Sequence, residues 1–166
     1  MSEALASIAP KLSVNTGLDD TRRRELAGDV AIVLADTFML YVKTQGVHWN
    51  VAGPSFHALH ELTEKQYKDQ FEAIDDLAER IRALGEKAPA SYSKFGEIST
   101  IVDRDEPQTA EEMVGMLVTD HEEIVRKLRQ LIAEAEDMQD WATHDLLTER
   151  IAKHEEAIWM LRATLA

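Results

Sequence analysis

Two pairs of metal-ligating side chains stand one helical turn apart in the middle of the sequence. His60 and Glu64 form the first pair, and Asp75 and Glu79 form the second. At 3.6 residues per turn, the four positions lie within about 100° of one another, so one face of a helix carries all of them. Imidazole and carboxylate groups in this pattern could bind a divalent cation. A solvated acidic face is the competing interpretation.

The distance between the two pairs limits how they could share a cation. His60 and Asp75 are separated by roughly 22 Å along a helix axis, so the pairs cannot meet at one ion within one chain. Two chains that laid this helix antiparallel across a two-fold axis would bring the first pair of one subunit to the second pair of the other, which would create two equivalent sites. His48, which we expect in the loop before this helix, could join His60 of its own chain.

A metal site inside one helical bundle is the alternative, but its defining motif is missing. Di-iron carboxylate bundles take a Glu-x-x-His motif from each of two helices. None of the six histidines has a glutamate three residues before it. The sequence therefore favours a site between subunits, or no site.

The composition restricts the chemistry further. The chain has 166 residues, no cysteine and a formal net charge of -13. Disulfides, thiolate metal sites and a cysteine nucleophile are therefore excluded, and any metal must be held by nitrogen and oxygen. The acidic balance attracts cations and opposes the basic surface that is typical of nucleic-acid binding.

The sequence shows no targeting or membrane segment. Its first residues lack the basic start and long apolar core of a secretory signal. No apolar run of about 18 residues could span a membrane. We therefore expect a cytoplasmic protein without a membrane partner.

Four long amphipathic segments must position the candidate ligands. Apolar periodicity predicts helices over about 19–46 and 55–84 and from Thr109 onward, and the fourth carries an apolar seam from Leu147 to Leu165. The third begins with a capping box, Thr109-Ala-Glu-Glu112. The pattern predicts an all-α fold.

The connections between these helices specify the architecture. The first two and the last two helices are joined by short loops, and a long crossover, in which Ser93 to Ile98 could form a short helix, links the pairs. A four-helix bundle with one long crossover is the ferritin-like arrangement. We expect residues 1–18 to form a flexible N-terminal arm and residues 19–166 a single ferritin-like domain.

Two other acidic or histidine-containing features have structural interpretations. His154 lies in the apolar seam of the last helix and is expected to be a core histidine. The cluster from Asp120 to Glu123 is expected to be mostly solvated surface, with Asp120 partly buried.

The chain resembles the Dps family, the DNA-protection-during-starvation miniferritins, in three stretches: His48-Trp-Asn-Val-Ala-Gly53, Phe56-His57-Ala-Leu-His60-Glu61 and Asp75-Asp-Leu-Ala-Glu79-Arg80. The resemblance extends over nearly the whole chain from about residue 20. It implies a hollow homo-dodecamer that oxidises Fe(II), preferentially with hydrogen peroxide rather than oxygen. The ferric iron would be stored inside, which would protect DNA from oxidative damage.

The resemblance also implies roles for individual residues. His48 and His60 would be catalytic iron ligands from one subunit. Asp75 and Glu79 would be catalytic iron ligands from its two-fold mate, with Glu79 as the bridge between ions.

Two neighbours of these ligands have implied roles as well. Trp49 would lie beside the iron. Glu64 stands where the family usually has aspartate, so it would bind a second iron either directly or through water. Zinc could compete for such nitrogen and oxygen ligands.

Three further acids leave two interpretations open. Asp140, Asp145 and Glu149 lie around the start of the last helix. In the Dps family, acids in this placement line pores on three-fold axes that admit Fe(II). The dipole of the helix also favours carboxylates at its N-terminus without any pore.

DNA binding is expected to be weak or absent. Many Dps proteins bind DNA through a Lys-rich tail, but the charges of residues 1–26 cancel and the C-terminus has no basic extension. If DNA were bound, the protein would be located in the nucleoid. The alternative from another class of protein is a non-enzymatic helical bundle that compacts DNA or serves as a scaffold.

Overall fold

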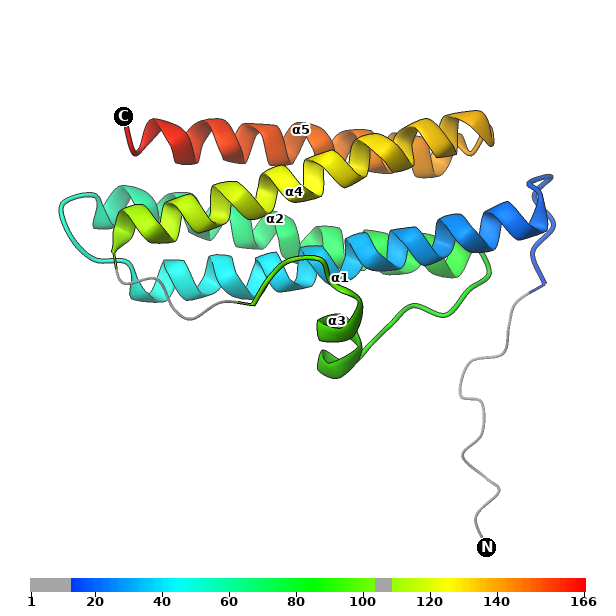
Figure 1. Cartoon of the computed structure of the whole chain (residues 1–166), viewed down its shortest axis with the longest axis horizontal. Helices are drawn as coiled ribbons and strands as arrows, with labels where there is room; N and C mark the ends of the chain where they lie inside the picture. Colours follow the sequence, from blue (N-terminus) through cyan, green and yellow to red (C-terminus); the bar gives the residue numbers. More distant parts are fainter. Residues whose placement is uncertain (1–12, 104–108) are drawn as a thin grey trace, which may run out of the picture.

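Five helices form the structure, a computed structural model that describes residues 13–103 and 109–166. They are α1 (Asp20–Asn50), α2 (Phe56–Ala83), α3 (Tyr92–Ile98), α4 (Ala110–Asp137) and α5 (Trp141–Ala163). Figure 1 shows α1 and α2 as one antiparallel pair and α4 and α5 as a second pair packed against it. No strand occurs in the described ranges. The expected N-terminal arm lies mostly in residues 1–12, outside the described residues.

Helix α1 extends further than the sequence pattern predicts. Asp19 begins it, because its carboxylate accepts hydrogen bonds from the backbone N–H groups of Thr21 and Arg22. An end near Gly46 was expected, but the Asn50 side chain donates to the Gly46 carbonyl and the helix continues to Asn50. His48 therefore lies in the last turn of α1, and the prediction of a loop at His48 was wrong.

Helix α2 has the expected limits. It begins after Ser55 and ends at Leu84, where Gly85 adopts a left-handed φ of 88° that favours glycine. Leu59, Leu77 and Ile81 are buried in the core. The opposite side of the helix is left to carry the candidate ligands.

The crossover between α2 and α4 is anchored to α1 through Asp36. This buried carboxylate accepts hydrogen bonds from the Ser99 and Thr100 hydroxyls, each at 2.8 Å, and from the Thr100 backbone N–H at 2.5 Å. Phe95 in α3 stacks on Phe38 in α1 with 4.6 Å between ring centroids. The predicted short helix is confirmed as α3, and it covers α1 on the side away from α4 and α5 (Figure 1).

The second helix pair follows the predicted pattern. Both hydrogen bonds of the Thr109–Glu112 capping box are present at the start of α4. A tight turn, in which Gln139 has a φ of 60°, joins α4 to α5. Together with the long crossover, these elements confirm an all-α bundle of four long helices and one short helix.

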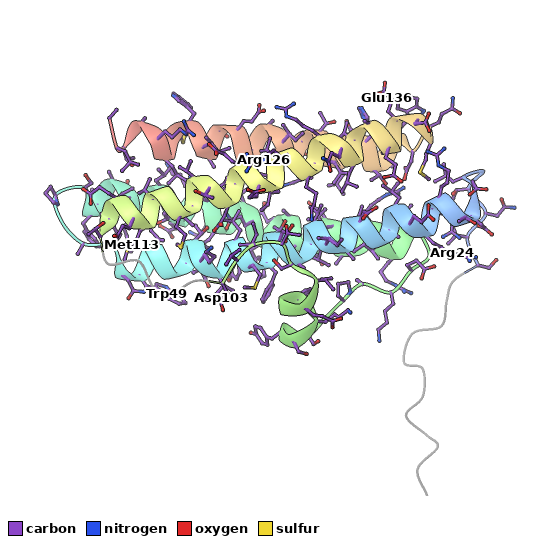
Figure 2. The ribbon with its side chains drawn as sticks, viewed as in Figure 1. Arg24, Trp49, Asp103, Met113, Arg126 and Glu136 are labelled. Atoms are coloured by element: carbon purple, nitrogen blue, oxygen red, sulfur yellow. The ribbon has the colours of Figure 1, made fainter. Side chains whose placement is uncertain are left out.

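The four long helices share one apolar core, but their mutual contacts are uneven. Helices α1 and α2 pack closely, as do α4 and α5, whereas α2 and α5 touch only sparsely. Side chains of both pairs project into the space between them (Figure 2). Among the described residues, no helix is both long enough and apolar enough to cross a membrane.

Candidate metal centre

His48 and His60 face each other where α1 turns into α2. Nδ1 of His48 lies 2.8 Å from the carbonyl oxygen of His60, and Nδ1 of His60 lies 2.9 Å from the carbonyl oxygen of His48. The two rings stack with 3.8 Å between centroids and 15° between planes. The last turn of α1 and the first turns of α2 are thus joined by two reciprocal side-chain hydrogen bonds.

This reciprocal pairing determines which nitrogens are available. A backbone carbonyl can only accept a hydrogen bond, so Nδ1 of each ring must donate. In each neutral ring, Nε2 then holds a free lone pair. A histidine that binds a metal usually has its other ring nitrogen held in this way by a carbonyl or carboxylate. Both rings are therefore oriented and in the tautomer required for metal binding through Nε2.

Glu64 lies one turn after His60, and its carboxylate forms an ion pair with Lys68. Lys68 Nζ lies 2.5 Å from Glu64 Oε1. The hydrogen bond and charge of Lys68 keep the pKa of Glu64 below its usual value, with smaller contributions from His48 and His60. The carboxylate is therefore charged close to the two imidazoles, but an incoming metal ion would compete with Lys68 for it.

Asp75 and Glu79 form the second pair on the same helix. Both side chains are exposed, and neither makes a hydrogen bond or ion pair within the described part of the chain. No group of three or more metal-ligating side chains comes together within the described residues. The two pairs of α2 therefore remain apart in one chain, as the rise of the helix requires.

The surface between the two pairs is aromatic. Phe71 is 63% exposed although it is a large apolar residue. Its ring contacts Tyr41, with centroids 5.9 Å apart, and Tyr41 in turn contacts Tyr67 at 6.3 Å. Tyr67 meets the His48 ring edge-on at 5.2 Å. An exposed Phe71 that continues into two half-buried tyrosine rings makes this part of the surface a candidate contact site.

Trp49 and His57 lie near the pair of His48 and His60 but take no part in its hydrogen bonds. Trp49 follows His48 directly and is 67% exposed at the end of α1 (Figure 2). His57 is also exposed, and its Nε2 lies 3.5 Å from a Glu61 carboxylate oxygen. His57 therefore offers a natural control for the other two histidines.

The three acids around the start of α5 do not share one environment. Asp140 is buried, caps α5 through Thr143, and pairs with Arg80 at 2.7 and 2.8 Å. Burial acts to raise the pKa of Asp140, but hydrogen bonds from Thr143 and Arg80 outweigh it and the pKa lies below its usual value. Asp145 and Glu149 are exposed one turn apart. Of the three acids, only Asp145 and Glu149 are accessible to a cation in solution.

The structure also reveals a buried histidine pair that the sequence interpretation did not identify. Nδ1 of His121 in α4 lies 2.8 Å from Nδ1 of His154 in α5. The prediction for His154 is confirmed, since it is 2% exposed. Of the cluster from Asp120 to Glu123, Asp120 is buried at 7% exposure, in line with its expected burial, and the two glutamates stay at the surface. His121 is only 2% exposed, so the prediction that it is solvated was wrong. Leu117 and Ile124, each one turn from His121, were the signal that it lies on the apolar face.

Comparisons with known proteins cover nearly the whole described fold. A ferritin-like domain family matches residues 32–166. An uncharacterized low temperature-induced protein of Nostoc is 40% identical over 153 residues, which cover 90% of this chain and 85% of that protein. DNA protection during starvation protein 2 of Bacillus anthracis is 38% identical over 132 residues, 80% of this chain and 90% of that protein.

The fold is also similar to a solved structure with comparable coverage. The DPS protein of Vibrio cholerae, described as a member of a broad superfamily of ferritin-like diiron-carboxylate proteins, superposes with a TM-score of 0.87 and 30% identity. The match covers 95% of this chain and all of that one. The similarity therefore includes the bundle, the crossover and both halves of the candidate site.

Proposed function

The chain belongs to the Dps family within the ferritin-like superfamily, and from that premise we propose that it is an iron-storing ferroxidase. It oxidises Fe(II), preferentially with hydrogen peroxide, and retains Fe(III) inside a hollow homo-dodecamer. Removal of Fe(II) and peroxide together protects DNA from oxidative damage. Iron is both substrate and cargo in this proposal.

The observation that carries the proposal is the reciprocal hydrogen bonding of His48 and His60. Each imidazole is held at Nδ1 by the other residue's carbonyl, so both Nε2 atoms are available. The two rings are also stacked with 3.8 Å between centroids, so both Nε2 atoms belong to one small region of the surface. Nitrogen ligands combined with carboxylates suit iron among the divalent metals, and zinc competes for the same set.

A second copy of the chain supplies the carboxylates. If α2 pairs antiparallel with its two-fold mate, centred between residues 69 and 70, His60 lies opposite Glu79 of the partner subunit. The same register places Glu64 opposite Asp75 of the partner subunit. One register therefore satisfies both pairings, and the two-fold axis produces two such sites for each pair of subunits.

The aromatic surface between the two pairs supports this contact. Phe71 lies close to the centre of the proposed pairing and is 63% exposed in the single chain. Burial of an aromatic side chain contributes about 1.5–3 kcal/mol. The same contact would thus bury this surface and bring the ligands of two chains together.

The chemistry follows from the ligand set. Two Fe(II) ions lose one electron each, and the two electrons with two protons cleave the O–O bond of hydrogen peroxide to give two water molecules. No hydroxyl radical is released when both electrons are delivered together. Negative carboxylates from Asp75 and Glu79 stabilise the higher charge of Fe(III), because charge pairing strengthens as the cation charge rises.

The proposal also includes a route for Fe(II) entry and an expectation for DNA binding. Asp145 and Glu149 are candidates for a pore that admits Fe(II), whereas Asp140 already serves α5 and Arg80. DNA binding is weak, because a net charge of -13 on each chain repels phosphates. Protection of DNA is therefore chemical and does not require direct binding.

A ferroxidase assay tests the proposal. Fe(II) and peroxide are mixed with the parent protein and with a His48→Ala/Asp75→Ala double variant, and ferric absorbance is followed. The proposal expects the double variant to lose most of the rate, while a His57→Ala control keeps it. Equal rates for the double variant and the parent would show that the assigned site is wrong. A native mass equal to that of one chain would show the same, because the site needs ligands from two chains.

A further inference from the structure

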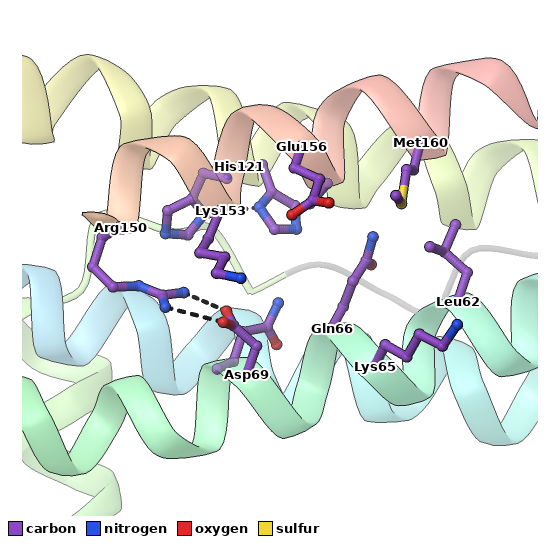
Figure 3. A pocket seen from close by; sticks show the side chains of 12 residues that line it. Leu62, Lys65, Gln66, Asp69, His121, Arg150, Lys153, Glu156 and Met160 are labelled. Atoms are coloured by element: carbon purple, nitrogen blue, oxygen red, sulfur yellow. Dashed lines mark hydrogen bonds and ion pairs between the residues drawn. The ribbon is translucent and has the colours of Figure 1, made fainter. Parts of the chain in front are cut away.

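A cavity with several polar side chains in its lining lies on the other side of α2 from the candidate iron ligands. This cavity of about 240 Å³ opens between α2, α4 and α5, where α2 and α5 touch only sparsely. Its lining includes Gln66, Asp69, Gln70, His121, Arg150 and His154. Figure 3 shows Gln66 reaching from α2 toward α5, with the Arg150–Asp69 ion pair beside it.

Several buried polar atoms of this lining have no hydrogen-bond partner within the described residues. They comprise both amide atoms of Gln66 and of Gln70, Nε2 of His121 and Nε of Arg150. The four residues are between 1% and 9% exposed. Folded proteins leave only a few buried polar groups unpaired per hundred residues. The concentration of unpaired donors around one cavity indicates that a polar ligand satisfies the N–H groups among them.

The buried pair of His121 and His154 provides a hydrogen-bond donor to the cavity region. The 2.8 Å contact between Nδ1 of His121 and Nδ1 of His154 requires one proton between them. When both rings are neutral, the ring that accepts must carry its own proton on Nε2. The pair therefore provides one Nε2–H group, in addition to the amide N–H groups of Gln66 and Gln70 and the Nε–H of Arg150.

The charge around the cavity has the opposite sign to that of the whole chain. Its lining carries the cations Lys65, Arg150 and Lys153 against the carboxylates Asp69 and Glu156. Asp69 is already engaged by Arg150 at 2.5 and 3.2 Å. Burial is the main cause that lowers the pKa of His121 to about 3, and the charge of Arg150 lowers it further, so this imidazole is neutral beside the cavity. A ligand here meets donors and a net positive charge.

We propose that the cavity between α2, α4 and α5 binds a small oxyanion, such as a phosphate or a simple carboxylate. The anion accepts hydrogen bonds from Gln66, Gln70 and Arg150 Nε. The volume is sufficient, because a water molecule occupies about 30 Å³ and the cavity equals several of these. A metal cation fits poorly, since Arg150 repels it and the half-buried carboxylate of Asp69 is already paired with Arg150.

A bound anion would also add to the Arg150–Asp69 ion pair, which already joins α2 and α5 where their backbones make few contacts. Gln66 and Gln70 belong to α2, whereas Arg150 belongs to α5. A ligand that binds only the folded protein stabilises it in proportion to its concentration above Kd. Saturating anion therefore raises the unfolding temperature. This inference does not depend on the proposed ferroxidase activity.

Calorimetric titration of the assembled, iron-free protein tests the proposal. Inorganic phosphate and sodium acetate are titrated separately at constant ionic strength, which distinguishes a phosphate from a carboxylate ligand. We expect one of them to bind and to raise the unfolding temperature. Replacing Gln66 or Gln70 by leucine should weaken binding by roughly tenfold or more, because hydrogen bonds to a charged ligand are the strong ones.

Two further variants keep the result decisive. Gln130→Leu makes the same substitution on the exposed side of α4 and should leave binding unchanged. Lys153→Gln changes an exposed residue of the lining and should weaken binding severalfold even if the buried variants fold poorly. The proposal is overturned if the parent binds neither anion, or if Gln66→Leu, Gln70→Leu and Lys153→Gln all bind as tightly as Gln130→Leu.

Discussion

Nδ1 of His48 donates to the carbonyl oxygen of His60, and Nδ1 of His60 donates in return to the carbonyl oxygen of His48. This exchange ties the last turn of α1 to the start of α2. It also fixes both tautomers, so that the two Nε2 atoms are free. The proposed half-site from one chain is therefore organised without a metal ion or a partner subunit.

Loss of either histidine should affect activity more than the loss of a neighbouring histidine. His48→Ala and His60→Ala are each expected to lower the initial rate of Fe(II) oxidation by peroxide at least tenfold. His57→Ala removes only an exposed imidazole and should retain the parent rate. Ferric absorbance in the first seconds measures the effect. Similar losses in all three variants would indicate a structural cause instead.

Lys68 should moderate metal binding through Glu64. Because Lys68 holds the Glu64 carboxylate, Lys68→Ala should release it and increase affinity for Zn(II), used as a redox-inactive probe. Exposed ion pairs are weak, so the expected gain is roughly two- to fivefold. Lys94→Ala removes a comparable exposed ion pair with Glu97 on α3 and serves as the control. An unchanged affinity in Lys68→Ala would mean that Glu64 is not a ligand.

Substitutions of the carboxylates near the start of α5 should differ in their effect on stability. Asp140→Ala removes a helix cap and leaves Arg80 without its carboxylate partner, so we expect a loss of about 2–4 kcal/mol in unfolding free energy. Denaturant titration measures this loss. Asp145→Asn with Glu149→Gln should leave stability unchanged, because both residues are exposed.

The same double variant tests iron access. If Asp145 and Glu149 attract Fe(II) to a pore, their neutralisation should slow iron uptake at micromolar Fe(II) severalfold, and added salt should reduce the difference from the parent. Uptake is followed by retained iron after gel filtration. Identical uptake curves at low salt would leave these acids with a purely local role at α5.

The buried pair of His121 and His154 should make stability depend on pH. Burial is the main cause that lowers both pKa values, that of His121 to about 3. A histidine with a lowered folded pKa binds protons more readily when unfolded, so its contribution to stability is constant above about pH 6.5 and falls as the pH decreases toward the folded pKa. For His121 alone the expected loss at pH 5 is about 2 kcal/mol.

Unfolding at several pH values checks this expectation. Denaturation curves between pH 7.5 and pH 4.5 should show a steep decrease in the parent. A His121→Leu/His154→Leu variant should show a shallower decrease, because its two positions no longer take up protons on unfolding. Parallel slopes in the two proteins would contradict the assigned protonation states.

The sequence predicted most of the bundle because its signals are local. Gly85 marks the end of α2, and the Thr109–Glu112 box marks the start of α4, and both are found as expected. The end of α1 was predicted too early because a glycine, here Gly46, often ends a helix. Here Val47 stays buried and the next turn packs against α2, and only tertiary contact decides this.

The candidate site shows the same division between local and tertiary information. Spacing along α2 predicts that His60, Glu64, Asp75 and Glu79 share a face, because helix geometry alone determines it. The hydrogen bonds between His48 and His60 depend on the path of the loop between two helices. The burial of His121 was hidden by its acidic neighbours Asp120, Glu122 and Glu123. Asp120 is accommodated in the bundle because it pairs with Lys43.

DNA binding offers an independent check on the role of charge. A chain with a net charge of -13 should not retain duplex DNA at physiological ionic strength. A gel-shift assay with the assembled protein is expected to show free DNA throughout. A shift that disappears with added salt would reveal a basic surface that the sequence charge conceals.

The central claim is that each iron site is shared between two chains, and subunit mixing tests it most directly. One variant, His48→Ala/His60→Ala, lacks the histidines, and the other, Asp75→Ala/Glu79→Ala, lacks the carboxylates. Each alone should form inactive cages. In cages co-assembled from equal amounts, half of the two-fold pairs are mixed, and each mixed pair contains one intact site. We predict recovery of roughly a quarter of the parent ferroxidase rate. Mixed cages as inactive as either variant would contradict a shared site.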